Sequence, residues 1–169
     1  MKQNICIIGL SNSFTKKVAK SIADAFEMFF ADITDLINFD LLDVEKARKL
    51  CGEEYIHKVE RIKVKTVATF ENTLFTMDYS LLNDDDNLKI TKDNAYIIYL
   101  KLTSNGLANV LQQAKTKENE IALKLNLYEF RNSLCEKYSD IVINCDGKNM
   151  SQILSDVGEA FLRKGKNGN

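Results

Sequence analysis

A short apolar run near the start of the chain, from Ile5 to Gly9, ends at a glycine. A run of this length with no polar residue is typical of a strand that is buried on both faces, as the strands of parallel sheets are. Apolar residues then recur at helical spacing from Thr15 to Phe26, and we expect Ser13 or Thr15 to cap that helix. A buried strand that leads into a helix indicates an α/β fold.

The alternation of strands and helices continues along the rest of the chain. Further apolar stretches predict strands at Met28 to Ile33, Thr73 to Met77, Ala95 to Leu102 and Asp140 to Asn144. Helical patterns run from Asp43 to Phe70 with a break at Gly52, from Leu107 to Tyr138 with an interruption at Lys115 to Asn119, and from Met150 to Leu162. The acidic run Asp84-Asp85-Asp86 is expected to be a solvated loop.

This order of elements predicts a three-layer α/β/α domain with a five-stranded parallel sheet. Right-handed crossovers place helices on both faces of such a sheet, and we expect Ile5 to Gly9 at its centre. A chain of 169 residues suits one domain. We therefore expect residues 1–164 to form a single domain and residues 165–169 to form a flexible tail.

Composition excludes several classes of function. The net charge of −1 gives no reason to expect nucleic acid or a membrane surface as a partner. No apolar run approaches the roughly 20 residues that span a bilayer, and the first residues show no cleavage site, so we expect a cytoplasmic protein. Four scattered cysteines and one histidine argue against a zinc site and for free buried thiols. Cys51 and Cys135 are expected to pack helices, and no metal is expected.

The first strand-to-helix junction is where a phosphate-binding loop would lie in such a fold. A working loop reads GxxxxGK[ST]: its glycines let backbone N–H groups approach the phosphates, its lysine neutralises them, and its hydroxyl holds Mg²⁺. Here Gly9 keeps the first position, whereas Phe14, Thr15 and Lys16 replace the second glycine, the lysine and the hydroxyl residue. The positions between them are Leu10, Ser11, Asn12 and Ser13.

The segment IIGLSNSFTKKVAKSIADAF is similar, without a gap, to the opening of the shikimate kinase family, which typically runs LIGFMGAGKSTVGRALA. Further segments follow in the family's order: FFADITDLI resembles FxDTDxLI, CGEEYIHKVE resembles GEExFRxxE, LFTMDYSLL stands in the place of ATGGGAVL, AYIIYLKL matches the fourth strand, RNSL resembles RxPL and SDIVINCDG resembles ADIVVDTDG. The resemblance covers most of the chain. It implies the five-stranded parallel sheet of nucleoside-monophosphate kinases and, in active members, phosphorylation of shikimate by ATP.

The resemblance also implies which positions would contact substrate and metal. Asp32 matches an acidic residue that helps to hold hydrated magnesium, and Arg131 matches an arginine that contacts the substrate carboxylate. Thr34 stands where the family has a second acidic residue for a substrate hydroxyl, and His57 stands where it has a carboxylate-binding arginine. Asp78 is the middle residue of Met77-Asp78-Tyr79, which replaces a glycine triplet.

Two charge changes oppose the family's reaction. Lys16 places a cation where Mg²⁺ would bind, and Asp78 places a carboxylate where the substrate carboxylate would lie. A shift of one residue turns a side chain by about 100° around a helix, so we do not expect Lys16 to replace the phosphate lysine. We predict instead that its ammonium pairs with Asp32. The lid arginine is also missing, and that segment keeps only Lys115 and Lys117.

We therefore expect a catalytically inactive shikimate-kinase-like protein that acts as a binding or regulatory module, with a small anionic ligand or a protein as its partner and no cofactor. The alternatives are an active small-molecule kinase that uses ATP and Mg²⁺ through an atypical loop, and a structural subunit of an oligomer. His57 is interpreted as a polar pocket-wall residue rather than a general base. Arg131 either binds an anion or forms a surface ion pair. No oligomeric state is predicted.

Overall fold

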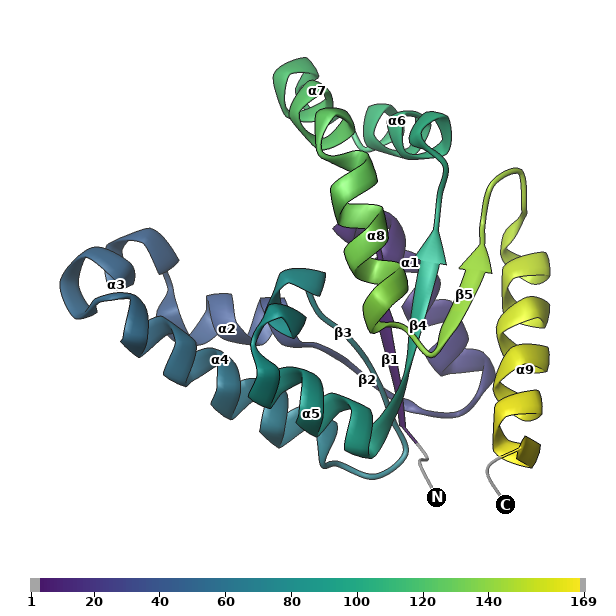
Figure 1. The fold of residues 1–169 in the computed structure, drawn as a ribbon, viewed down its shortest axis with the longest axis horizontal. Coiled ribbons are helices and arrows are strands. Elements are labelled where there is room, and N and C mark those ends of the chain that lie inside the picture. Colours follow the sequence, from purple (N-terminus) through teal and green to yellow (C-terminus); the bar gives the residue numbers. More distant parts are fainter. Residues whose placement is uncertain (1–3, 168–169) are drawn as a thin grey trace.

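The computed structural model describes residues 4–167, which form one parallel sheet between two layers of helices (Figure 1). The strands, in chain order, are β1 (Asn4–Ile8), β2 (Phe29–Asp32), β3 (Thr73–Thr76), β4 (Ala95–Lys101) and β5 (Ile141–Asn144). Within the described residues they make a five-stranded sheet in the order β2-β3-β1-β4-β5, and every neighbouring pair is parallel. The predicted sheet, with the first strand at its centre, is confirmed.

The apolar core lies around the central strand β1. All five of its residues are buried, and Ile5 pairs with Leu74 of β3 on one side and with Tyr96 of β4 on the other. A central strand needs apolar side chains on both faces because helices cover each of them. The edge strand β2 is less protected, and Phe29 at its start is 75% exposed. The apolar pattern of Ile5 to Gly9 therefore reflects the position of β1 in the sheet.

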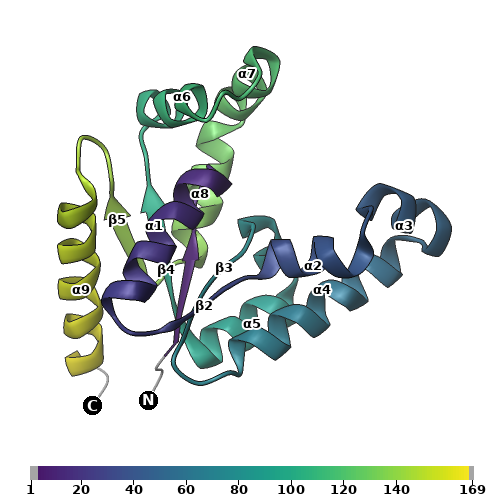
Figure 2. The same ribbon diagram turned by 180° about the vertical axis from the view of Figure 1, so that it is seen from behind.

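Helices surround the sheet and extend beyond it. They are α1 (Asn12–Ala25), α2 (Ile33–Leu41), α3 (Val44–Cys51), α4 (Glu53–Ala68), α5 (Asp85–Asn94), α6 (Ser104–Gln113), α7 (Glu118–Asn126), α8 (Tyr128–Tyr138) and α9 (Met150–Asn167), with the short 3₁₀ helix η1 (Tyr79–Asn83). Helices α1 and α9 cover one face of the sheet, and α4, α5 and α8 cover the other (Figure 1, Figure 2). Helices α2 and α3 form an arm to one side, while α6 and α7 lie beyond the carboxyl end of β4 (Figure 1).

The acidic run at residues 84–86 is not the solvated loop that the sequence predicted. Asp84 is the N-cap of α5, and its side chain accepts hydrogen bonds from the backbone N–H groups of Asp86 and Asn87. Asp85 and Asp86 occupy the first turn of the helix. Carboxylates are favoured there because the helix N-terminus carries a partial positive charge. The acidic run therefore forms the start of α5 and is not a loop.

Helix α2 was also not predicted. The predicted strand ended at Ile33, but β2 ends at Asp32 and Ile33 is already the first residue of α2. Asp32 caps this helix, because its Oδ1 accepts the backbone N–H of Asp35 at 2.7 Å. One residue thus ends a strand and begins a helix, which leaves no loop to mark the boundary.

Other predictions on the organisation of the chain have mixed outcomes. The break at Gly52 is confirmed between α3 and α4. Cys6, Cys135 and Cys145 are buried free thiols as predicted, but Cys51 is exposed because α3 buries none of its residues. Helix α9 runs to Asn167 and so includes residues 165–167 of the predicted tail, whereas residues 168–169 lie outside the described residues. Across residues 4–167, no helix is long and apolar enough to cross a membrane.

Candidate functional site

Two pockets lie where the chain leaves β1 and β3, and Asn12 and Asp78 line both of them. The large pocket has a volume of about 420 Å³ and is lined by Gly9, Leu10, Asn12, Asp78, Tyr79, Ser80, Glu120, Leu123, Lys124 and Arg131. The small pocket has a volume of about 180 Å³ and is lined by Asn12, Thr15, Lys16, Asp32, Thr34, Asp35, Asn38, Thr76, Met77 and Asp78. Ligands bind at this edge of open parallel sheets.

The junction between β1 and α1 is short. Strand β1 ends at Ile8 and α1 begins at Asn12, so residues 9–11 make the whole connection. The N-cap is Ser11, not Ser13 or Thr15 as predicted, and its carbonyl accepts the backbone N–H of Thr15 at 2.9 Å. The helix therefore starts before the first residue that was expected to cap it, and Ser13 and Phe14 are helical.

Thr15 is turned into the protein at this junction. Its side chain is 3% exposed, and its hydroxyl has no hydrogen-bond partner among the described residues. A Cβ atom built on Gly9 would lie 2.1 Å from that hydroxyl oxygen, so the contact depends on glycine. Thr15 and Gly9 thus pack directly against each other, and Thr15 reaches far less toward solvent than a lysine at this position would.

Lys16 forms ion pairs across the small pocket. Its Nζ lies 2.7 Å from Asp35 Oδ2 and 3.4 Å from Asp32 Oδ2. Partial burial alone would lower the pKa of Lys16, but the hydrogen bond to Asp35 and the charges of Asp32 and Asp35 outweigh it and raise the pKa above its usual range. The predicted pairing of Lys16 with Asp32 is confirmed, while Asp35 is a partner that the sequence analysis missed.

Asp32 is held by several contacts besides Lys16. The hydroxyl of Thr76 donates to Asp32 Oδ2 at 2.7 Å, and Asp32 Oδ1 caps α2. Close by, Thr34 Oγ1 accepts the backbone N–H of Asp78 at 3.1 Å, and Asp78 Oδ1 accepts the backbone N–H of Ser80. These bonds join the start of α2 to the segment after β3. The wall between the two pockets is therefore a hydrogen-bonded unit.

Arg131 lines the large pocket without a carboxylate partner among the described residues. The other three arginines form ion pairs: Arg48 with Glu45 and Glu53, Arg61 with Asp84 and Asp86, and Arg163 with Glu159. Arg131 is half-buried on α8 and comes close to Tyr79. Burial raises the pKa of Tyr79, the Arg131 guanidinium lowers it, and the Asp78 carboxylate raises it. The surface ion pair that was an alternative for Arg131 is not present within residues 4–167.

The sequence of this chain matches a model of the shikimate kinase family from residue 16 to residue 161. The chain belongs to the shikimate kinase family. A shikimate kinase of Sulfurihydrogenibium sp. is 25% identical over 169 residues, which cover 96% of this chain and 99% of that protein. The family match begins at Lys16, so it leaves out the β1–α1 junction.

Solved structures of shikimate kinases have the same fold. The enzyme from Bacteroides thetaiotaomicron has a TM-score of 0.78 at 18% identity, covering 94% of this chain and 97% of that chain. The enzyme from Acinetobacter baumannii, solved in complex with shikimate, has a TM-score of 0.80 at 14% identity, covering 97% and 95%. At these identities the likeness concerns the fold.

The structure separates the positions that the shikimate kinase resemblance assigns to ligands. Arg131 lines only the large pocket, Asp32 and Thr34 line only the small one, and Asp78 lines both. His57 lines neither of them, because it lies near the start of α4, where its side chain is 50% exposed. His57 Nδ1 is 2.9 Å from Glu60 on its own helix. The interpretation of His57 as a pocket-wall residue therefore finds no support at these two pockets.

Residues of α7 complete the large pocket, and the sequence analysis missed them. Glu120, Leu123 and Lys124 lie three and four positions apart, so they share one side of that helix. This spacing was the signal available in the sequence, and the structure adds that the apolar side chain of Leu123 is 58% exposed. Lys115 and Lys117, the cations expected in the lid, precede this helix and line neither pocket. The pocket cation from this region is Lys124.

The small pocket does not fit the magnesium ion that the family's reaction uses. Of the three aspartates that line it, Asp32 and Asp35 already hold the ammonium of Lys16. Asp32 also accepts the hydroxyl of Thr76 and caps α2, which fixes its carboxylate in place. A divalent cation at this place would meet a fixed positive charge, and like charges at short range repel strongly in a partly desolvated site.

Proposed function

We propose that this member of the shikimate kinase family does not transfer phosphate and acts as a binding or regulatory module through its large pocket. The observation that carries the proposal is the β1–α1 junction. Thr15 stands where the phosphate lysine would be, and its buried hydroxyl packs against Gly9. No side chain at this position reaches out to neutralise a phosphate.

Physical reasoning on phosphoryl transfer supports the proposal. The reaction depends on positioning and on stabilising negative charge, and the protein does little covalent chemistry. Loss of one preorganised donor costs about 10²–10³ in turnover in well-studied enzymes. Here the lysine position is Thr15, and the metal position holds Lys16 paired with Asp32 and Asp35. Such losses are not additive, but they remove both sources of positive charge that would act on the phosphates.

The remaining pocket supports binding of a small anion. Arg131 offers a half-buried guanidinium with no carboxylate partner in the described part of the chain. Burying an uncompensated charge is costly, so a ligand that supplies the opposite charge gains affinity. The volume of about 420 Å³ lies within the usual range for small-molecule sites, about 300–1,000 Å³. We place the protein in the cytoplasm, where free thiols such as Cys6, Cys135 and Cys145 stay reduced.

Calorimetric titration with ATP–Mg²⁺ and then with shikimate tests this proposal, together with an assay for ADP release. We expect no heat from ATP–Mg²⁺ and no turnover with shikimate. Turnover that disappears in the Lys16→Met variant would contradict the proposal and show that this chain is an active kinase. Turnover that persists in Lys16→Met and stays with the protein through further purification would also contradict the proposal.

A further inference from the structure

Four charged side chains line the large pocket: two acids, Asp78 and Glu120, and two bases, Lys124 and Arg131. None of the four forms an ion pair with another described residue. Elsewhere in the structure, ion pairs are common on exposed helices, as between Lys89 and Asp93 within α5. The charges that line this pocket are therefore compensated by solvent and not by each other.

Asp78 is the more constrained of the two acids. It is half-buried, its backbone N–H donates to Thr34, and its Oδ1 accepts the backbone N–H of Ser80. Its other carboxylate oxygen has no hydrogen-bond partner among the described residues. Glu120 is exposed on α7 and has no such support. The fixed negative charge of the pocket is therefore Asp78.

Arg131 supplies the opposite charge from another wall. It is half-buried on α8, and Tyr79 lies within electrostatic reach of both Arg131 and Asp78. The two charged groups thus face one cavity with Tyr79 near both, yet they do not form an ion pair with each other. A ligand that contacts both of them meets a guanidinium and a carboxylate.

We infer that the large pocket binds a small zwitterion, whose anionic group contacts Arg131 and whose primary amine contacts Asp78. A ligand with only a carboxylate would satisfy Arg131 and leave Asp78 repelling it. An amine converts that repulsion into a charge-assisted hydrogen bond. This inference rests on the proposed function, because it assumes that the pocket binds a ligand of its own rather than a kinase substrate.

Ligand titrations by NMR test the inference with three matched series. Linear ω-amino acids from β-alanine to ε-aminocaproate carry both charges at increasing separation. The carboxylates from propionate to caproate carry only the anion, and the amines from propylamine to hexylamine carry only the cation. We expect one ω-amino acid to bind about tenfold or more tightly than its matched carboxylate, since hydrogen bonds to charged groups have that strength.

The Asp78→Asn variant decides which residue is responsible. Asparagine keeps the oxygen that accepts the N–H of Ser80, so the fold of η1 is retained. We expect the preference for the amino acid to disappear while carboxylate affinity stays equal or rises. Arg131→Gln should weaken the binding of the ω-amino acids and of the carboxylates. The control variant Asp43→Asn, at the capping position of α3, should leave the preference intact. A preference lost in Glu120→Gln instead of Asp78→Asn would overturn the assignment to Asp78.

The outcomes separate this inference from the proposed function. If no ω-amino acid binds more tightly than its carboxylate, or if the preference survives Asp78→Asn, the inference is overturned while anion binding at Arg131 stands. If no probe binds at all, both the inference and the proposed binding role fail. ATP-dependent turnover would overturn the proposed inactivity and the inference together, because the pocket would then hold a kinase substrate.

Discussion

The ammonium of Lys16, near the start of α1, lies 3.4 Å from the carboxylate of Asp32, at the end of β2. Asp32 is 10% exposed, so its negative charge needs a partner within the protein. Asp35 completes the arrangement from the first turn of α2, at 2.7 Å from the same ammonium. The resemblance to the shikimate kinase family implies that active members hold magnesium between the positions of Lys16 and Asp32. Here the protein carries its own cation there.

This arrangement predicts how the protein responds to magnesium. We expect Mg²⁺ to leave the melting temperature of the wild-type protein unchanged. The Lys16→Ser variant should lose about 1 kcal/mol of stability, the upper end for a pair at this exposure, and should regain part of it when Mg²⁺ is added. Lys17→Ser, which alters an exposed neighbour, is the matched control and should show no Mg²⁺ effect. Equal stabilisation of wild-type and variant protein by Mg²⁺ would contradict the pairing.

The contact between Gly9 and Thr15 predicts a strong coupling of two mutations. Gly9→Ala places a Cβ atom 2.1 Å from the Thr15 hydroxyl, and the overpacking should destabilise the fold by about 1–3 kcal/mol. Thr15→Ala removes that oxygen, so Gly9→Ala should cost much less in the double variant. Denaturant unfolding of the four proteins measures the coupling. Gly158→Ala is the control, because its Cβ meets only ordinary contacts, with Phe26 at 3.5 Å. If the changes in unfolding free energy caused by Gly9→Ala and Thr15→Ala simply add in the double variant, the contact is refuted.

The buried hydroxyl of Thr15 has a consequence of its own. A polar group that is buried without a partner lowers stability, because it loses its hydrogen bonds to water. Thr15→Val keeps the shape of the side chain and removes the hydroxyl. We expect the free energy of unfolding to rise by about 1 kcal/mol. A loss of stability in Thr15→Val would mean that the hydroxyl has a hydrogen-bond partner in solution.

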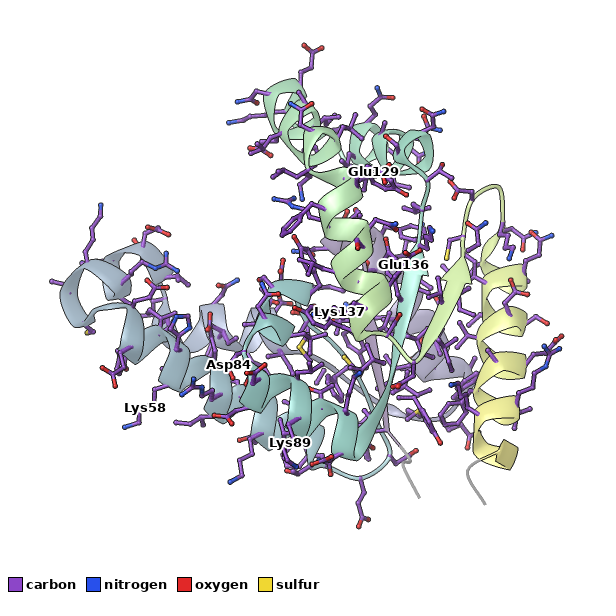
Figure 3. All side chains as sticks on the ribbon, in the orientation of Figure 1. Lys58, Asp84, Lys89, Glu129, Glu136 and Lys137 are labelled. Atoms are coloured by element: carbon purple, nitrogen blue, oxygen red, sulfur yellow. The ribbon has the colours of Figure 1, made fainter. Side chains whose placement is uncertain are left out.

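The cap at Asp84 predicts a dependence on pH. Figure 3 shows Asp84 at the start of α5, where Arg61 donates to its carboxylate at 2.7 and 2.9 Å. The hydrogen bond from Arg61 lowers the pKa of Asp84 below its usual value of 3.8, burial opposes this, and the backbone N–H of Asn87 adds to the lowering. A lowered pKa contributes stability that is complete above the unfolded value and is lost as pH falls through the folded value.

We therefore expect Asp84→Ala to lower the free energy of unfolding by about 1 kcal/mol at neutral pH, as for other capping residues. The difference from the wild-type protein should shrink as pH falls below 3.8. Asp84→Asn keeps the cap and loses the charge, so its defect should be smaller at neutral pH. Chemical denaturation between neutral and acidic pH measures both, and a difference that stays constant over this range would contradict the role of the charge.

His57 should be dispensable. Its exposed side chain contacts Glu53 and Glu60 on its own helix, and surface pairs of this kind contribute little. We expect His57→Ala to change the free energy of unfolding by less than about 0.5 kcal/mol and to leave the binding of small carboxylates unchanged. Arg131→Gln in the same titration should lose that binding. A His57→Ala variant that binds as weakly as Arg131→Gln would place His57 at the pocket.

Much of the fold follows from local patterns along the chain. The buried strands β1 and β4 are visible as apolar runs, because a strand with helices on both faces needs apolar side chains at every position. Helices α2 and α5 were not predicted, for two different reasons. The cap of α2, Asp32, is also the last residue of β2, so no loop precedes that helix, and the cap of α5, Asp84, lies within an acidic run. An aspartate is a common N-cap residue, so both helix starts had a signal in the sequence. The acidic run at Asp84 also fits a solvated loop, and Asp32 also fits the end of a strand.

The sequence by itself determined the order of the five strands, the family, and the exchange of charges at Thr15, Lys16 and Asp78. Only the tertiary structure decided where those side chains point. Asp35 joins Lys16, and α7 brings Lys124 to the pocket of Arg131, because distant segments meet according to how whole helices pack on the sheet. Side-chain spacing within one helix or strand is a local property of the chain. The distance between two helices is set by the core that they share, and no local pattern records it.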